Sequence, residues 1–180
     1  MRTVAAWTCA LVVGGSAVAG FQNSTRPAGA QSPDPQHALL DKMTGHWVMR
    51  GTIGKQQTTH DVDAKWVLND EYVQIHEVSR DKDATGKPTY EALIHVVWDA
   101  KAHEFACLWL DTTAIANFPP NGVGHAKPDG DAMTFIFTDP AGGDHTTFAY
   151  DRTKDSWTWS IDSENKGALS PFARLTLTRP

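Results

Sequence analysis

The segment Ser156-Trp157-Thr158-Trp159-Ser160-Ile161-Asp162 places a large apolar side chain at every second position and a small polar one between them. The segment Met133-Thr134-Phe135-Ile136-Phe137-Thr138 has the same period, with Met133, Phe135 and Phe137 in phase. A period of two is that of a β-strand with one buried and one solvated face. These two segments therefore predict antiparallel sheet.

The rest of the chain from Trp47 onward keeps this strand-like rhythm. Clusters of Gly, Pro, Asn and Asp divide it into runs of strand length, and one such cluster predicts a turn over 164–171. The ten predicted strands are 47–53, 58–68, 72–80, 89–98, 104–111, 122–126, 132–138, 145–150, 156–162 and 172–178. Short runs joined by tight turns favour an all-β fold with up-and-down connections. Since closure removes both exposed edges, we expect a single antiparallel barrel of about ten strands.

One short helix is expected before the first strand. It spans His37 to Met43, with Asp34 or Ser32 near the N-cap and Gly45 as the stop. The runs 93–98 and 105–110 are apolar on both faces, so they need cover outside the barrel as well as inside. The helix is the natural candidate for that cover.

The interior of such a barrel is either hollow or filled by its own side chains. An eight-stranded barrel is just wide enough to fill or to hold one small ligand, so about ten strands favour a cavity. Six Trp residues remain after Trp7 is set aside, and they favour a filled core almost as strongly. The loop Thr112 to Gly122 carries Ile115 and Phe118, which is consistent with either a lid or a plug.

The N-terminus has the pattern of an export signal. Arg2 precedes an uncharged, Ala- and Val-rich stretch that ends in Ala17-Val18-Ala19, as in a secretory signal peptide. We therefore expect residues 1–19 to be a signal peptide, 20–35 a flexible leader and 36–180 the barrel domain. Cleavage is expected after Ala19 or, at a second small-residue pattern, after Ala30. The predicted location is periplasmic or secreted.

Composition limits the classes of molecule that the protein is expected to bind. The chain has 180 residues, 41% of them hydrophobic, and a formal net charge of −5, which becomes −6 once Arg2 is removed with the signal. No basic run exists, so neither nucleic acid nor a stable membrane anchor is expected as a partner or attachment. A small apolar ligand remains as the expected partner, and composition leaves the oligomeric state open.

The sequence Leu39-Leu40-Asp41-Lys42-Met43-Thr44-Gly45-His46-Trp47 resembles the opening of a calycin barrel, in which a short helix leads into Gly-x-Trp on the first strand. Further matching positions are Trp66-Val67-Leu68, Tyr72-Val73-Gln74, Tyr90-Glu91-Ala92-Leu93, Trp98-Asp99, Trp109-Leu110-Asp111, Gly130 and Trp157-Thr158-Trp159. Together they resemble the bacterial domain-of-unknown-function family 1579 (DUF1579), of the calycin or lipocalin-like superfamily, over about 39–179. The resemblance implies structural barrel closure by Gly45, Trp47 and Arg179, with Arg174 as a second candidate for the arginine. It carries no catalytic residue.

Heme-binding, nitrobindin-like calycins share the Gly-x-Trp start, and they place a heme-ligating His just before the last strand. This chain has Ser170-Pro171-Phe172 there, so the resemblance supplies no axial ligand and no cofactor is expected. A heme- or metal-binding barrel stays as an alternative.

Recognised catalytic and metal motifs are absent from the sequence. There is no Gly-x-Ser-x-Gly, no closely spaced His pair and no Cys-x-x-Cys, and Cys107 lies in an apolar run that would raise its pKa and leave it inert. We expect no catalytic or metal-ligating residue and favour a non-enzymatic role. The alternative is a small enzyme that uses His76, His95, Glu91 or Asp111 at the barrel mouth as acid–base groups.

A mostly apolar cavity with a few polar groups is what a small-molecule site requires. The candidate ligand-binding side chains are Tyr72, Gln74, His76, Glu91, His95, Trp109 and Asp111. Strand periodicity leaves open whether the first five face the interior or the solvent. The sequence thus predicts an exported barrel that binds a small apolar molecule.

Overall fold

The computed structural model describes residues 34–113, 122–139 and 142–180. One helix, α1 (Pro35–Met43), precedes the strands. The strands are β1 (Gly45–Ile53), β2 (Gln56–Val67), β3 (Tyr72–Ser79), β4 (Glu91–Asp99), β5 (Glu104–Asp111), β6 (Val123–Ala126), β7 (Pro128–Asp129), β8 (Ala132–Asp139), β9 (Gly142–Asp151), β10 (Ser156–Asn165) and β11 (Ala168–Thr178). The expected signal peptide and leader up to residue 33, and most of the loop expected to form a lid or plug, lie outside the described residues.

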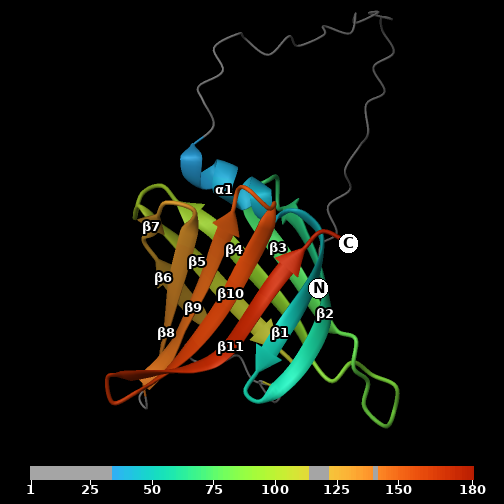
Figure 1. Ribbon diagram of the computed structural model, residues 1–180. Helices are drawn as coiled ribbons and strands as arrows, with labels where there is room; N and C mark the ends of the chain where they lie inside the picture. Colours follow the sequence, from blue (N-terminus) through green and yellow to red (C-terminus); the bar gives the residue numbers. More distant parts are fainter. Residues whose placement is uncertain (1–33, 114–121, 140–141) are drawn as a thin grey trace, which may run out of the picture. The chain divides into compact units, whose positions relative to one another are not determined.

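The strands form one closed antiparallel barrel (Figure 1). Each long strand pairs with its neighbour in sequence, and β1 also pairs with β11. The circle closes between β6 and β8, where His125 pairs with Ile136. The short β7 is an extra strand against β8. This confirms the predicted all-β barrel of about ten strands with a short N-terminal helix.

Helix α1 lies across one end of the barrel (Figure 1). Its N-cap is Asp34, whose carboxylate accepts a hydrogen bond from Gln36 N at 3.0 Å, and Pro35 occupies the first turn, where a missing N–H costs nothing. The helix buries Leu39, Leu40 and Met43. The apolar side of the helix therefore closes this end of the barrel.

The predicted closure by Gly45, Trp47 and Arg179 is seen at the same end. The Arg179 guanidinium carbon lies 3.5 Å from the centre of the Trp47 ring, and its Nη1 donates to Thr44 O at 3.0 Å. Gly45 has φ +108°, which L side chains rarely adopt, and a Cβ there would come within 2.5 Å of that Nη1, so glycine suits this position. Arg174, the second candidate, instead pairs with Asp162.

Side chains fill the interior beneath α1. Trp157 Nε1 donates to Lys42 O at 3.1 Å and Trp47 Nε1 to Met43 O at 2.7 Å, which joins the barrel wall to the helix. Towards the middle, the Phe148 and Trp159 rings stack at 4.4 Å. The part of the barrel nearest α1 is thus a packed core.

Two sequence-based expectations are wrong. The stretch 164–171 is not one long turn, because β10 continues to Asn165 and β11 begins at Ala168. Pro171, which cannot donate to a ladder, is accommodated at a register shift opposite Asp162.

The other correction concerns the cover expected from the helix. Helix α1 lies over the barrel end, and the outward Leu93 and Leu108 remain exposed, as do Val123 and Ile136 on the strands that follow. Apolar side chains on the outer face of β4 and β5 were therefore not a sign of a packed helix.

Candidate functional site

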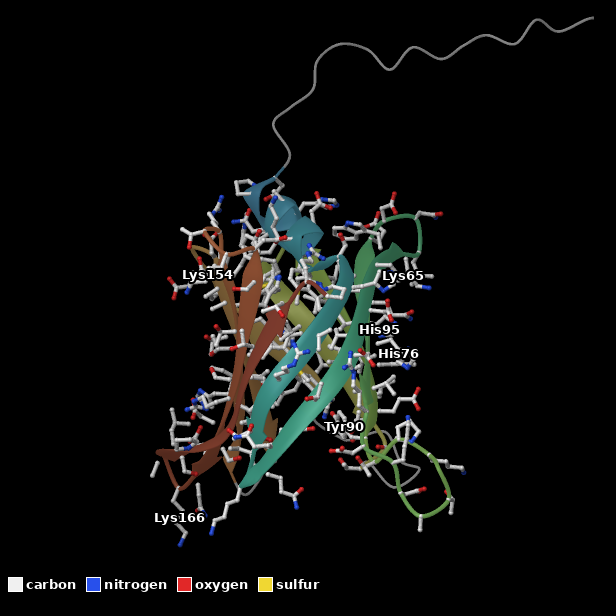
Figure 2. The ribbon with its side chains drawn as sticks, turned by 45° about the vertical axis from the view of Figure 1, so that its right-hand side comes forward. Lys65, His76, Tyr90, His95, Lys154 and Lys166 are labelled. Carbon is white, nitrogen blue, oxygen red and sulfur yellow. The ribbon has the colours of Figure 1, made fainter. Side chains whose placement is uncertain are left out.

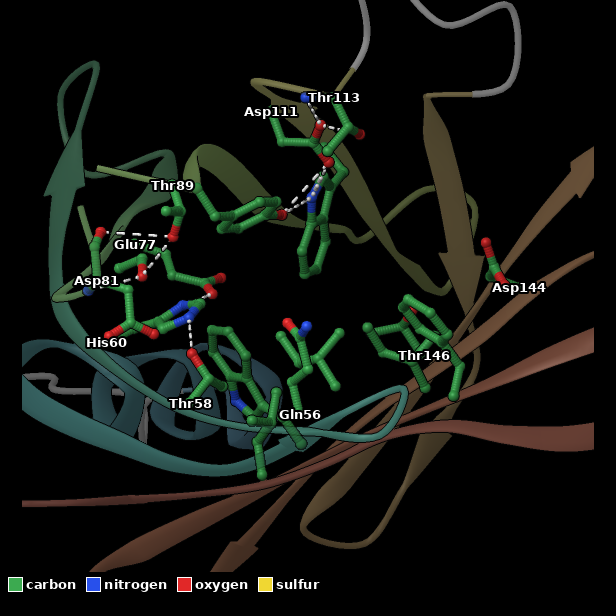
Figure 3. A pocket seen from close by; sticks show the side chains of 18 of the residues that line it. Gln56, Thr58, His60, Glu77, Asp81, Thr89, Asp111, Thr113, Asp144 and Thr146 are labelled. Carbon is green, nitrogen blue, oxygen red and sulfur yellow. Dashed lines mark hydrogen bonds and ion pairs between the residues drawn. The ribbon is translucent and has the colours of Figure 1, made fainter. Parts of the chain in front are cut away.

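A cavity of about 670 Å³ occupies the barrel interior away from α1. One part of its wall is apolar and is formed by Ile53, Phe137, Trp159, Ile161, Phe172 and Leu175. Another part carries polar groups and includes Thr58, His60, Glu77, Tyr90, Trp109 and Asp111. The barrel is therefore filled at one end and hollow at the other (Figure 3).

One polar group of the cavity is a hydrogen-bonded chain of three side chains, two of them buried. His60 Nδ1 donates to Glu77 Oε1 at 2.5 Å, and His60 Nε2 lies 2.6 Å from the Thr58 hydroxyl (Figure 3). The side chains of His60 and Glu77 are only 2% and 3% exposed. A neutral His60 accepts the hydroxyl proton at Nε2, whereas a protonated His60 donates to Thr58.

Strand register explains why these groups meet. On β2, Thr58, His60 and Val62 point inward at every second position. Val62 pairs with Glu77 across the β2–β3 ladder and His60 pairs with Ser79, so His60 and Glu77 are diagonal neighbours on the inner face.

A second polar group surrounds Asp111. Trp109 Nε1 donates to Asp111 Oδ2 and to Tyr90 Oη, both at 3.1 Å, while Tyr90 donates to the same carboxylate at 3.3 Å. Burial raises the pKa of Tyr90 well above its ordinary value, and the nearby charges of Glu77 and Asp111 raise it further. Tyr90 is therefore a neutral phenol in a negative surrounding.

Of the seven candidate ligand-binding residues, Trp109 and Asp111 line the cavity. The other five, Tyr72, Gln74, His76, Glu91 and His95, alternate with buried inward residues and lie on the outer face of β3 and β4. Figure 2 shows His76 and His95 outside the barrel wall. There His76 Nε2 contacts Glu91 Oε1 at 2.7 Å, and Gln74 Nε2 contacts His95 Nε2 at 2.9 Å. The strand periodicity had left their face open, and the structure places it outside, because the inward phase belongs to Val73, Ile75 and Glu77 on β3 and to Ala92, Ile94 and Val96 on β4.

The acid–base candidates of the alternative enzyme are divided between the two faces of the sheet, with Asp111 inside the barrel and His76, Glu91 and His95 outside. Cys107 is buried, and burial raises the pKa of its thiol, as predicted. Among the described residues, no three His, Cys, Asp or Glu side chains are placed to hold a metal ion.

Sequence reasoning missed Thr58, His60 and Glu77. The available signal was their phase, because Glu77 shares a strand face with Val73 and Ile75, and His60 shares one with Val62 and Ala64. A charged or polar residue in phase with the apolar side of a strand points into the barrel.

The cavity does not fit a heme. His60 is the one histidine among the described lining residues, and both of its ring nitrogens are already hydrogen-bonded. The position that carries the axial ligand in nitrobindin-like barrels falls on β11, where Phe172 contributes an apolar side chain to the cavity.

A scan of protein-family models and a search of curated proteins each gave no match to this chain. Over the part of the chain that the structure describes, no helix is long and apolar enough to cross a membrane.

Proposed function

We propose that this chain is an exported, lipocalin-like barrel protein that binds a small, largely apolar molecule without consuming it. The cavity of about 670 Å³ carries the proposal. Small-molecule sites are typically concave, mostly apolar and of roughly 300–1,000 Å³, with a few placed polar groups. The N-terminal sequence pattern supports export, and intact-mass measurement of protein from its own source tests cleavage after Ala19 or Ala30.

The binding test is a fluorescence titration of the full chain with N-phenyl-1-naphthylamine, a neutral apolar probe. We expect saturable enhancement with a dissociation constant in the range of about 0.1–10 μM, as for a ligand of this size buried in an apolar pocket. Ile161→Trp adds an indole within the cavity wall and should weaken binding at least about tenfold, because ligand and indole compete for one space.

The matched control is Thr158→Trp, three residues earlier on β10, where the side chain is exposed on the outer face. It should leave the dissociation constant unchanged. Equal affinity of both variants, with thermal unfolding showing that each is folded, contradicts binding in the cavity.

A second candidate function, a small hydrolase, is favoured by the Thr58–His60–Glu77 chain. A hydroxyl, an imidazole and a carboxylate in hydrogen-bonded order are the parts of a nucleophile, a base and an orienting group. Thr58 Oγ1 would attack an ester carbonyl while His60 Nε2 takes its proton and passes it to the leaving alkoxide. Water would then release the acyl group from Thr58.

Turnover of p-nitrophenyl esters tests this second candidate. Thr58→Val should abolish it, while Thr59→Val, on the outer face of β2, should not. Turnover that survives Thr58→Val, or none in the unmodified chain, removes the hydrolase from consideration and leaves binding intact.

A further inference from the structure

The carboxylate of Glu77 is only half satisfied by the protein. Its Oε1 accepts the hydrogen bond from His60, and among the described residues nothing hydrogen-bonds to Oε2. The side chain is 3% exposed, lines the cavity and points toward its open space in Figure 3. Because Glu77 lines the cavity, a bound molecule that supplies an N–H or O–H can donate a hydrogen bond to this carboxylate.

The charges around the cavity favour one sign of ligand. Four carboxylates line it, those of Glu77, Asp81, Asp111 and Asp144, and no Lys or Arg is among the described lining residues. Among the described lining residues His60 is the single basic group, so four carboxylates against one imidazole leave −3 even when His60 is protonated. Lys55 and Lys166, in the turns at this end, are exposed and do not line the cavity.

The aromatic side chains of the cavity wall also favour a positively charged ligand. The rings of Trp109 and Trp159 lie edge to face with centroids 6.5 Å apart, and both line the cavity. Ring faces carry a negative quadrupole that attracts cations and repels anions. The raised pKa of Tyr90, caused first by burial and then by Glu77 and Asp111, is consistent with negative potential at this wall.

We infer that the cavity selects an apolar molecule that carries a protonated amine, and that this ammonium group donates to Glu77 Oε2 while the apolar body lies against Ile161, Phe137 and Leu175. The inference rests on the proposed binding function and names its ligand class. Fatty acids, the other common amphiphiles of this size, are disfavoured because their carboxylate would meet the unpaired oxygen of Glu77.

The test uses three ligands that differ only in their headgroup. Decylamine, decanol and decanoate displace N-phenyl-1-naphthylamine from the full chain near pH 7, where the amine is cationic because its pKa is about 10. We expect decylamine to bind at least about tenfold more tightly than decanol, with decanoate the weakest of the three. Equal affinities, or decanoate as the best ligand, overturn the inference.

Glu77→Gln isolates the responsible charge, because glutamine keeps a carbonyl oxygen for His60 Nδ1. Its amine-to-alcohol preference should fall to within about twofold, because the negative charge that attracts the ammonium group is gone. The matched control is Glu91→Gln, which alters the pair of His76 on β3 and Glu91 on β4. This pair lies on the outer face, where the side chains are 41% and 46% exposed. That variant should keep the full amine preference.

Retention of the preference in Glu77→Gln also overturns the inference. The ranking of the three ligands by the unmodified chain decides the question even if the variant does not fold. If the neutral probe itself does not bind, the proposed function fails; if it binds and the amine has no advantage, only the ligand class fails.

Discussion

Arg179 shows how one side chain fastens the end of the barrel. Its guanidinium covers the Trp47 ring at 3.5 Å, donates to Thr44 O at 3.0 Å and pairs with Asp155 at 3.1 Å. These contacts connect the last strand to the segment between α1 and β1, 135 residues earlier. Residues far apart in sequence are thereby held at one point.

Replacing Arg179 with alanine should lower the free energy of unfolding by about 1–2 kcal/mol, since it removes the cation over the indole and a hydrogen bond to a backbone carbonyl. Urea denaturation measures this. Arg80→Ala breaks an exposed ion pair with Asp61, which water and salt screen, and should change stability little. A cost for Arg179→Ala no larger than that of Arg80→Ala contradicts the closing role.

Asp151, at the end of β9, predicts a pH dependence. Hydrogen bonds from the Thr153 hydroxyl (2.6 Å) and backbone N–H (2.9 Å), with a contribution from Lys154, lower the pKa of Asp151 from about 3.8 to about 2. A carboxyl whose pKa is depressed by folding stabilises the native state above its unfolded pKa, and this contribution is lost as pH falls through the folded value. The loss should therefore occur between about pH 4 and pH 2.

Carboxyl-detected NMR should show Asp151 titrating near 2, and the Asp151→Asn variant should have a shallower fall in urea midpoint over that range than the unmodified chain. An Asp151 midpoint near the ordinary carboxyl value would show that the Thr153 contacts do not hold the ionised form.

Helix α1 closes one end of the barrel by burying its apolar side there. Leu40 is 1% exposed, so Leu40→Ala should cost about 2–4 kcal/mol from lost burial and the cavity left behind. Leu169, on β11 and 56% exposed, is the matched control, and its alanine variant should change stability by less than about 0.5 kcal/mol. Similar costs at the two positions, measured by thermal unfolding, contradict the packing of α1.

The strands were predictable because half-buried strands repeat every two residues, as in Trp157, Trp159 and Ile161. The lengths of the strands were less predictable. Asn165 and Pro171 are residue types that favour turns, yet both are paired in the ladder between β10 and β11. Tertiary pairing outweighs local turn propensity at such strand ends.

The site was less predictable than the fold, for a physical reason. Polar side chains of a strand normally face water, but the strand period alone left open which face of β3 carries Tyr72, Gln74 and His76. The polar groups that do line the interior, Glu77 and His60, are in phase with the apolar residues Ile75 and Val62 of their strands. Of the candidates, Trp109 and Asp111 line the cavity, since both lie on the inner face of β5.

For the whole molecule, closure of the sheet produces two unlike ends. Beneath α1, Trp47 and Trp157 lie in a packed core, whereas the other end encloses a cavity of about 670 Å³. A barrel of about ten strands is too wide for its own side chains to fill completely. With a helix closing one end, the unfilled space lies at the other end. The alternative surface for an apolar ligand is the outer face, where Leu93, Leu108 and Ile136 are exposed on β4, β5 and β8.

Methyl NMR of the full chain, titrated with N-phenyl-1-naphthylamine, separates these two surfaces most directly. Binding in the cavity predicts large shift changes at the methyl groups of Ile53, Ile161 and Leu175, with those of Leu40 on α1 unmoved. Changes confined to the outer methyls of Leu93, Leu108 and Ile136, with the three cavity residues unchanged, would contradict the account.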